Sequence, residues 1–267
     1  MVREEVIMLV FNNEDYLNER TKYYFVEKFK NLDGSKVFTD YDNYLVCQSA
    51  PGAQVWLWTK DNLSVEKVKE LKGVLLNNYV TSDKLTFTSK RFVYDYLKDT
   101  SNSYELDEYF EMGTLNCLDT VEPKEVDAYL DYFHEDDYET AAKYYYMDQN
   151  EMGLNDSVTM EYAYKHVKPW LENDKYRLLR NKNGKVVSMV SYDTFDNMAK
   201  LGNVYTPKEE RRKGYCAYLV YSLTKELLEL GFTPLLYTDY NYVNSNNAYK
   251  KVGYKDTGLL VTYTLKK

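Results

Sequence analysis

The sequence is poor in the residues that build metal centres and catalytic triads. Its only histidines are His134 and His166, which excludes a histidine-rich metal site and argues against a Ser-His-Asp triad. The three cysteines, Cys47, Cys117 and Cys216, lack metal-ligand spacing and cannot all pair with one another. We therefore expect no bound metal, and free thiols in a reducing compartment.

Long apolar runs and an excess of positive charge are also missing. No run approaches the roughly 20 residues that span a bilayer, and the start of the chain is too short and too acidic for a signal peptide. The formal net charge of -8 disfavours nonspecific nucleic-acid binding and favours cationic substrates such as amines. These absences predict a cytoplasmic protein with neither a membrane nor a nucleic acid as its partner.

Proline and glycine are scarce, with 5 and 11 among 267 residues, so those present mark turns and the ends of elements. The apolar content of 44% suffices for one large domain or two smaller ones. Hydrophobic periodicity breaks over residues 113–122. We place a boundary there, which predicts an N-terminal domain over residues 1–115 and a C-terminal domain over residues 116–267.

The N-terminal part alternates short strand patterns with helical ones. Ser64 is expected to cap a helix over residues 65–76, and Pro51-Gly52 to form a hairpin turn. Trp56 and Trp58 share one face of a strand, and we favour a core face over a binding platform. The other expected elements are a strand or helix edge at Val6–Val10, helices at residues 16–30 and 91–97, and strands at residues 36–38, 44–48, 54–58, 85–88 and 104–110.

After the boundary the pattern predicts helices and then a meander of strands. Thr120 with Pro123 is typical of a helix start, and residues 125–134 have the spacing of an amphipathic helix. Further helices are expected at residues 140–148 and 158–170, the second closed by Pro169. Asn183-Gly184 predicts a hairpin between strands at residues 175–181 and 185–192, and residues 198–206 pair next.

The stretch 201–254 carries the strongest signal for a binding site. A strand over residues 201–206 is stopped by Pro207, and a basic loop then leads into an apolar-faced helix that ends near Gly231. A second strand at residues 234–238 is expected to lie parallel to the first. Gly214 in the loop allows close approach of an oxyanion to a helix N-terminus, which favours a phosphate or pyrophosphate site. The alternative is an ordinary helix N-terminus with solvated basic residues.

The order of these elements resembles the GNAT superfamily of acyl-CoA-dependent N-acetyltransferases. In that family a Gln/Arg-x-x-Gly-x-Gly/Ala loop binds the pyrophosphate of coenzyme A, and Arg211 and Gly214 match it. Cys216 stands where Gly or Ala is usual, which is a departure by another small residue. Residues 236–254 resemble the later acyl-CoA segment, although its usual Asn-Pro is replaced by Tyr242-Val243.

The resemblance implies an α/β fold, in which helices flank a mixed central sheet, preceded by a similar but degenerate N-terminal domain. It implies acetyl-CoA as co-substrate and an amine-bearing small molecule or peptide as acceptor. It also implies that the strand before the loop pairs with the pantetheine amides, the alternative being an ordinary central strand. The cofactor-binding residues implied in this way are Val204, Tyr205, Thr206, Arg211, Arg212, Lys213, Gly214, Tyr215, Cys216, Ala217 and Asn246.

The same resemblance implies that Tyr249 protonates the departing thiolate, because a phenol and a thiol have pKa values of similar size. The alternative is one more packed tyrosine among thirty. Asn246 is expected to begin the helix that bears Tyr249, as its cap or as a cofactor ligand. Cys216 is better explained by its size than as a nucleophile. The carboxylates weighed as general base are Asp193, Asp196, Asp239 and Glu151, each with a solvated surface role as the alternative.

We therefore expect an N-acetyltransferase that moves acetyl from acetyl-CoA to a primary amine by direct transfer. Two alternatives remain open: an acyl-CoA-binding sensor without turnover, and a structural role for the N-terminal half in interaction or dimerisation. A homodimer is left open as well, and the acceptor is not specified by the sequence.

Overall fold

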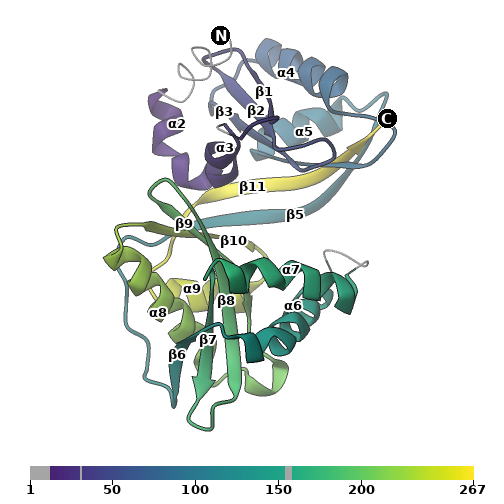
Figure 1. Cartoon of the computed structure of the whole chain (residues 1–267). Coiled ribbons are helices and arrows are strands. Elements are labelled where there is room, and N and C mark those ends of the chain that lie inside the picture. The colour runs from purple at the N-terminus through teal and green to yellow at the C-terminus, as the bar shows by residue number, and fades with distance from the viewer. Residues whose placement is uncertain (1–12, 31, 154–157) are drawn as a thin grey trace. The chain divides into compact units, whose positions relative to one another are not determined.

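The computed structural model describes residues 13–30, 32–153 and 158–267 (Figure 1). Contacts divide the described chain into two compact units. The first contains the residues up to 114 together with 238–242 and 256–267, and the second contains residues 115–237 and 243–255. The expected strand or helix edge at residues 6–10 lies outside the described residues.

The first unit is a mixed sheet with helices packed against it. Its strands follow the order β1-β2-β3-β4-β11-β5, with β3 and β4 parallel and the other described pairs antiparallel. Ser64 caps α4 by accepting a hydrogen bond from the Lys67 N–H at 3.3 Å, as expected. Its elements are α2 (Glu14–Asn18), η1 (Arg20–Tyr23), α3 (Tyr24–Phe29), β1 (Lys36–Thr39), β2 (Tyr44–Gln48), β3 (Val55–Thr59), α4 (Val65–Asn78), β4 (Leu85–Ser89), α5 (Arg91–Asp99), β5 (Glu105–Asn116) and β11 (Lys255–Lys266).

The two tryptophans of β3 belong to the core of this unit, as predicted. Trp56 and Trp58 are both buried, and the indole N–H of Trp58 donates to Glu19 at 3.0 Å. Tyr16 packs edge-on against Trp58 at 5.3 Å between ring centroids. A surface binding platform at this strand is therefore excluded.

The second unit is also a mixed sheet, in the order β10-β9-β8-β7-β6. The strands β6 to β9 are antiparallel neighbours, whereas β10 is parallel to β9, as expected from the helical crossover between them. Its elements are β6 (Ala128–Tyr132), η2 (Glu135–Asp137), α6 (Tyr138–Met152), α7 (Met160–Glu172), β7 (Tyr176–Asn181), β8 (Val186–Phe195), β9 (Met198–Tyr205), η3 (Lys208–Glu210), α8 (Tyr215–Glu229), β10 (Thr233–Asp239) and α9 (Val243–Lys251).

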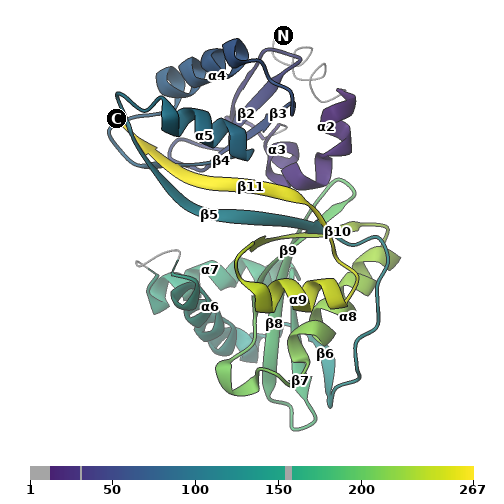
Figure 2. The same cartoon turned by 180° about the vertical axis from the view of Figure 1, so that it is seen from behind.

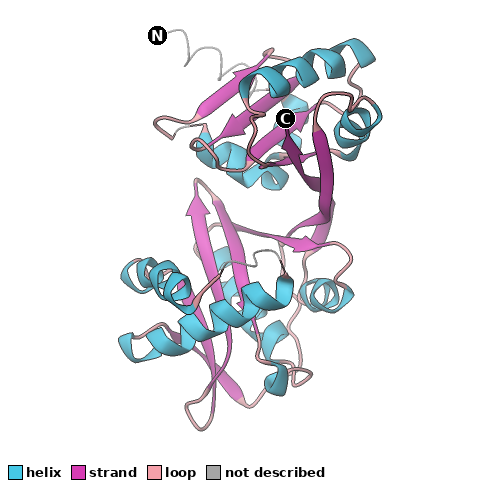
Figure 3. Ribbon diagram, turned by 90° about the vertical axis from the view of Figure 1, so that its right-hand side faces the viewer, coloured by secondary structure: helices cyan, strands magenta, loops and turns pink. Residues whose placement is uncertain are grey.

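Helices cover both faces of the second sheet (Figure 3). On one face, Ala142 and Tyr145 of α6 and Val167 of α7 pack with Leu178 and Met189. On the other face, the apolar residues of α8 and α9 pack against the sheet, and α9 lies in front in Figure 2. Burial on both faces explains why the middle strands are nearly continuous apolar runs.

Three helix predictions in this unit are wrong: the helix over residues 125–134, the helix start at Thr120 with Pro123, and the helix end at Pro169. Residues 128–132 form the strand β6, which pairs with β7 over five residues. The apolar spacing there fitted a helix, but the ladder to β7 satisfies the backbone and overrides it. The helix expected to begin near Pro123 is absent from the described chain. Pro169 does not close α7, which continues to Glu172.

Candidate functional site

The strand β9 leaves its neighbour β10 part of the way along. The parallel ladder joins Met198–Leu201 to Thr233–Leu236, and β9 then continues to Tyr205. Beyond the ladder the register with β8 shifts by one residue, and Asn203 has a φ of +49°. This is a β-bulge, which bends a strand and re-aims its backbone groups. Residues 202–205, which include the predicted pantetheine-binding Val204 and Tyr205, therefore follow a different path from β10.

The basic loop connects β9 to the N-terminus of α8. Pro207 and η3 come first, then Arg212 with a φ of +64° and Gly214 with a φ of +88°. Gly214 is the N-cap of α8, and no side chain of the described residues caps this helix. A Cβ at Gly214 would lie 3.1 Å from Cγ1 of Val126. Both the positive φ and the tight space require glycine here, and the first N–H groups of α8 are left for an anion.

Arg211 is held at the base of this loop by a network that reaches α6. Its Nε donates to the Thr206 carbonyl at 2.8 Å, and its Nη2 donates to Glu151 at 2.5 Å. The Tyr205 hydroxyl donates to the other oxygen of Glu151 at 2.9 Å. Burial raises the pKa of Glu151, but the hydrogen bonds from Arg211 and Tyr205 outweigh it and hold that pKa below its usual range. Glu151 is thus a charged partner of the loop arginine, which disfavours it as a general base.

The other side chains of the loop differ in their surroundings. Lys213 pairs with Glu210 at 2.7 Å, and Arg212 is exposed. Cys216 lies in the first turn of α8, where burial raises the pKa of its thiol to about 11. A protonated thiol is a poor nucleophile, so the geometry agrees with the packing role expected for Cys216.

Tyr249 and Asn246 lie on α9, against the face of the sheet that α8 also covers. Tyr249 is buried, and its ring packs edge-on to Tyr254 at 6.2 Å. Asn246 lies one turn inside α9, which begins at Val243, so the expectation that Asn246 starts this helix is wrong. The roles of both residues toward a cofactor stay predictions.

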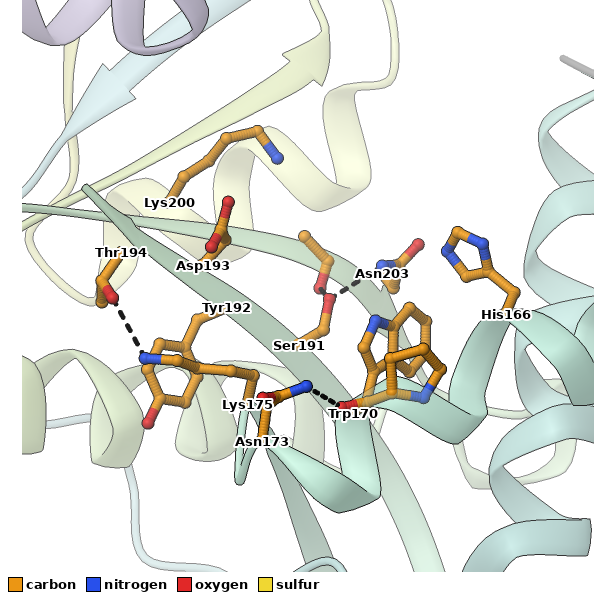
Figure 4. Close-up of a pocket in the computed structure, with 12 residues that line it drawn as sticks. His166, Trp170, Asn173, Lys175, Ser191, Tyr192, Asp193, Thr194, Lys200 and Asn203 are labelled. Carbon is orange, nitrogen blue, oxygen red and sulfur yellow. Dashed lines mark hydrogen bonds between the residues drawn. The ribbon is translucent and has the colours of Figure 1, made fainter. Parts of the chain in front are cut away.

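A pocket of about 480 Å³ opens between the end of α7 and the strands β8 and β9 (Figure 4). Of its residues, only Asp193 is a candidate for a catalytic role from the sequence. The pocket is lined by His166, Pro169, Trp170, Asn173, Lys175, Ser191, Tyr192, Asp193, Thr194, Lys200, Gly202 and Asn203. The signal that could have found it is the Gly202-Asn203 pair inside a strand pattern, which is typical of a bulge.

The floor of the pocket is built around this bulge. Ser191 donates to the Gly202 carbonyl at 2.9 Å, and the Asn203 amide donates to the Ser191 hydroxyl at 2.7 Å. Asp193 and Lys200 are direct partners in the ladder between β8 and β9, so a carboxylate and an ammonium share this face. The floor is therefore polar and charged on the same strand that leaves β10.

The wall of the pocket is aromatic. Trp170 stacks on Tyr176 at 4.3 Å and meets His166 edge-on at 4.9 Å. The ammonium of Lys175 bonds the Thr194 hydroxyl at 3.0 Å, on the opposite side from His166 in Figure 4. An apolar wall opposite a polar floor suits a small molecule that has both kinds of surface.

The remaining carboxylates weighed as bases lie elsewhere. Asp196 is exposed in the tight turn between β8 and β9, with a φ of +52°. Asp239 ends β10, where its carboxylate accepts a hydrogen bond from the Asn241 N–H at 2.9 Å. Asp193 is therefore the one member of that set that lines the pocket.

A family model matches the region that contains β9, the basic loop, α8 and α9, and solved structures match nearly the whole chain. The family model described as "FR47-like protein" matches residues 180–263. A comparison with curated protein sequences gave no match. Among solved structures, a GNAT-family acetyltransferase from Colwellia psychrerythraea is similar with a TM-score of 0.58 at 14% identity, over 95% of this chain and 96% of that one.

Two further structures agree. A GCN5-related N-acetyltransferase from Sphaerobacter thermophilus has a TM-score of 0.58 at 12% identity, over 90% of this chain and 84% of that one. Another from Kribbella flavida has a TM-score of 0.58 at 10% identity, over 95% and 96% of the two chains. The α/β fold that the resemblance implied, with helices flanking a mixed sheet, is therefore confirmed.

The described residues offer neither a metal centre nor a membrane-spanning helix. No group of three or more His, Cys, Asp or Glu side chains among them could hold a metal ion. No helix in the described part of the chain is long and apolar enough to cross a membrane.

A buried carboxylate beside the loop network makes stability depend on pH. Asp148 is 8% exposed on α6, and burial, with a further contribution from Glu151, raises its pKa to about 7. The folded state therefore binds this proton more tightly than the unfolded state does. The stability that this group contributes is present below its ordinary pKa of 3.8 and is lost as pH rises toward about 7.

We predict that Asp148→Asn raises the melting temperature at pH 8 and changes it little at pH 4. The reason is that the amide removes the need to ionise a buried group at the higher pH. Thermal unfolding at the two pH values measures this, with exposed Asp136→Asn as the matched control. An equal shift in melting temperature at both pH values would contradict the raised pKa of Asp148.

Proposed function

We propose that the second unit is an N-acetyltransferase that transfers acetyl from acetyl-CoA directly to a primary amine. The observation that carries this proposal is the departure of β9 from β10 immediately before a glycine-capped helix N-terminus. A cofactor with amides and a pyrophosphate needs both features in this order, because its amides pair with a strand and its phosphates with helix N–H groups. The acyltransferase fold agrees with this reading.

Residues 204–206 would pair with the pantetheine amides. They form the end of β9, beyond its ladder with β10, and the first residue after it. The loop residues Arg211 to Ala217 would receive the pyrophosphate, with Asn246 as a further ligand. Arg211 is preorganised by Thr206 and Glu151, and a bound pyrophosphate would compete with the Glu151 carboxylate for its guanidinium. The residues present thus fit the cofactor.

The reaction forms one bond and breaks one. The amine nitrogen attacks the thioester carbon, the carbon–sulfur bond breaks, and the thiolate takes a proton from Tyr249. The pocket beneath the bulge is the proposed acceptor site, because its floor includes Gly202 and Asn203, where β9 leaves β10. Binding in that position brings the amine and the acetyl group together on one strand.

We further propose that the N-terminal domain, residues 1–115, is a degenerate acetyltransferase-like domain that binds no cofactor.

An amine-bearing small molecule or peptide remains the proposed acceptor, in keeping with the net charge of -8. A cytoplasmic location is proposed because the three cysteines are free thiols, which suits a reducing compartment. A homodimer remains a proposal as well.

The function is tested by measuring free-thiol release from acetyl-CoA with a panel of amines. The panel contains an alkylamine, an arylalkylamine, a polyamine, an amino sugar and a dipeptide with a free N-terminus. Amine-dependent thiol release supports the transferase. Binding of acetyl-CoA without release for any amine supports the alternative, an acyl-CoA sensor.

The loop makes a prediction about affinity. Gly214→Asp places a carboxylate where the pyrophosphate should lie and should weaken coenzyme A binding more than about tenfold, or about 1.4 kcal/mol. Equilibrium dialysis measures the affinity. Gly184→Asp is the matched control, because Gly184 also has a positive φ, +79°, and lies in the β7–β8 hairpin with open space around it.

A second control separates charge from the collision with Val126. Gly214→Ala adds the Cβ without the charge and should weaken binding less than Gly214→Asp. Unchanged affinity in a folded Gly214→Asp variant would remove the loop from the cofactor site.

Tyr249→Phe tests the proposed acid. The variant keeps the ring and its packing but removes the proton, so the chemical step should slow about a hundredfold or more with acetyl-CoA affinity nearly kept. Single-turnover thiol release measures the step. Tyr254→Phe is the matched control, because the Tyr254 hydroxyl bonds Thr224 in the same core at 2.8 Å and should affect melting temperature more than rate. A wild-type rate in Tyr249→Phe would end the acid assignment.

A further inference from the structure

A direct transfer leaves one proton unassigned. An alkylammonium group has a pKa near 10, so the acceptor arrives protonated and must lose a proton before its nitrogen can attack. Of the carboxylates weighed above, Glu151 is bonded to Arg211, and Asp193 faces Lys200 across the ladder. The pocket holds one other side chain that can accept a proton near neutral pH, His166.

His166 is fixed in orientation by aromatic contacts. Its imidazole stacks on Tyr145 of α6 at 4.4 Å with an interplanar angle of 14°, and on Tyr162 of α7 at 5.7 Å with an angle of 20°. Trp170 meets it edge-on at 4.9 Å. Stacking uses the faces of the ring and leaves its nitrogen atoms at the rim. Figure 4 shows this ring on the side of the pocket where Asn203 lies.

The surroundings keep His166 in the form that a base requires. Burial lowers the pKa of the imidazole, so the ring is neutral at pH 7. The titratable groups around it are the phenol of Tyr145 on α6 and that of Tyr162 on its own helix, and Lys175, Asp193 and Lys200 line the same pocket. Burial raises the pKa of Tyr145, which therefore stays neutral as well.

We propose that His166 is the general base of the second unit and accepts the ammonium proton of the acceptor, directly or through one water. This inference rests on the proposed transferase function. The first proton passes from the ammonium group to an imidazole nitrogen, and the freed lone pair attacks the thioester carbon. As the carbon–sulfur bond breaks, the thiolate takes a proton from Tyr249, and the nitrogen loses its second proton, which restores Tyr249 through solvent. The imidazolium then releases its proton to solvent, so one proton is released for each amide formed.

The assignment predicts a particular pH dependence. In the wild-type protein kcat/KM should fall at acidic pH, because His166 becomes protonated there, at a pKa that burial holds below the ordinary value for histidine. Without the base, the reaction must use the small fraction of amine that is already neutral. For His166→Gln, kcat/KM at pH 7 should therefore fall about a hundredfold and then rise about tenfold per pH unit toward the pKa of the amine.

The experiment measures kcat/KM from pH 5.5 to 9.5 with whichever panel amine gives the most thiol release. His134→Gln is the matched control, because His134 is the only other histidine and its side chain is 61% exposed. Asp193→Asn is measured over the same pH range, because Asp193 is the carboxylate weighed as a base that lines the pocket. His166→Ala with added imidazole provides a rescue, since the small ring can occupy the space that the side chain leaves beside Tyr145.

The outcomes separate the two hypotheses. No amine-dependent thiol release by the wild-type protein would overturn the transferase function and this inference with it. An active wild-type protein whose His166→Gln variant keeps its rate and its pH profile would overturn the inference alone, as would transfer of the predicted profile to Asp193→Asn. A steepened profile in His166→Gln, restored in His166→Ala by imidazole, supports His166 as the base.

Discussion

The site depends on a single constraint in the backbone of β9. A parallel ladder holds this strand to β10 as far as Leu201, and the bulge at Asn203 then directs its last residues elsewhere. Backbone N–H and C=O groups need partners, and a strand that has left its neighbour offers them to a ligand. The path of β9 beyond Leu201 sets the positions of the basic loop, the N-terminus of α8 and the pocket.

Charge is arranged around the same strand. Arg211 bonds the Thr206 carbonyl just past the end of β9, and Glu151 joins that arginine to Tyr205. One network therefore connects α6, β9 and the loop, and a ligand phosphate would enter a site that is already oriented. At the other end of the free stretch, the aromatic wall formed by α7 faces the floor of β8 and β9. The cofactor and acceptor sites proposed here thus share one strand.

The sequence predicted those parts of the fold that depend on local signals. The Asn183-Gly184 turn, the Ser64 cap and the parallel β9–β10 pair are all present. The Arg211 and Gly214 loop was recognisable because a helix N-terminus needs glycine where φ is positive and space is short.

What could not be predicted depends on partners distant in the chain. Residues 128–132 are a strand because β7 is beside them, and no local spacing reveals that neighbour. Pro169 is tolerated inside α7, where packing of the helix against the sheet outweighs the lost hydrogen bond. His166, Ser191 and Asn203 come from three elements, so only the folded chain shows that they line one pocket.

The central claim is that one unit of this chain binds coenzyme A for acyl transfer. Native mass spectrometry of the full chain with saturating coenzyme A tests it most directly, because it counts bound cofactor without any acceptor. The account predicts one coenzyme A per chain. Either no bound cofactor or two per chain would contradict it, the first by removing the cofactor site and the second by showing that the N-terminal half binds one as well.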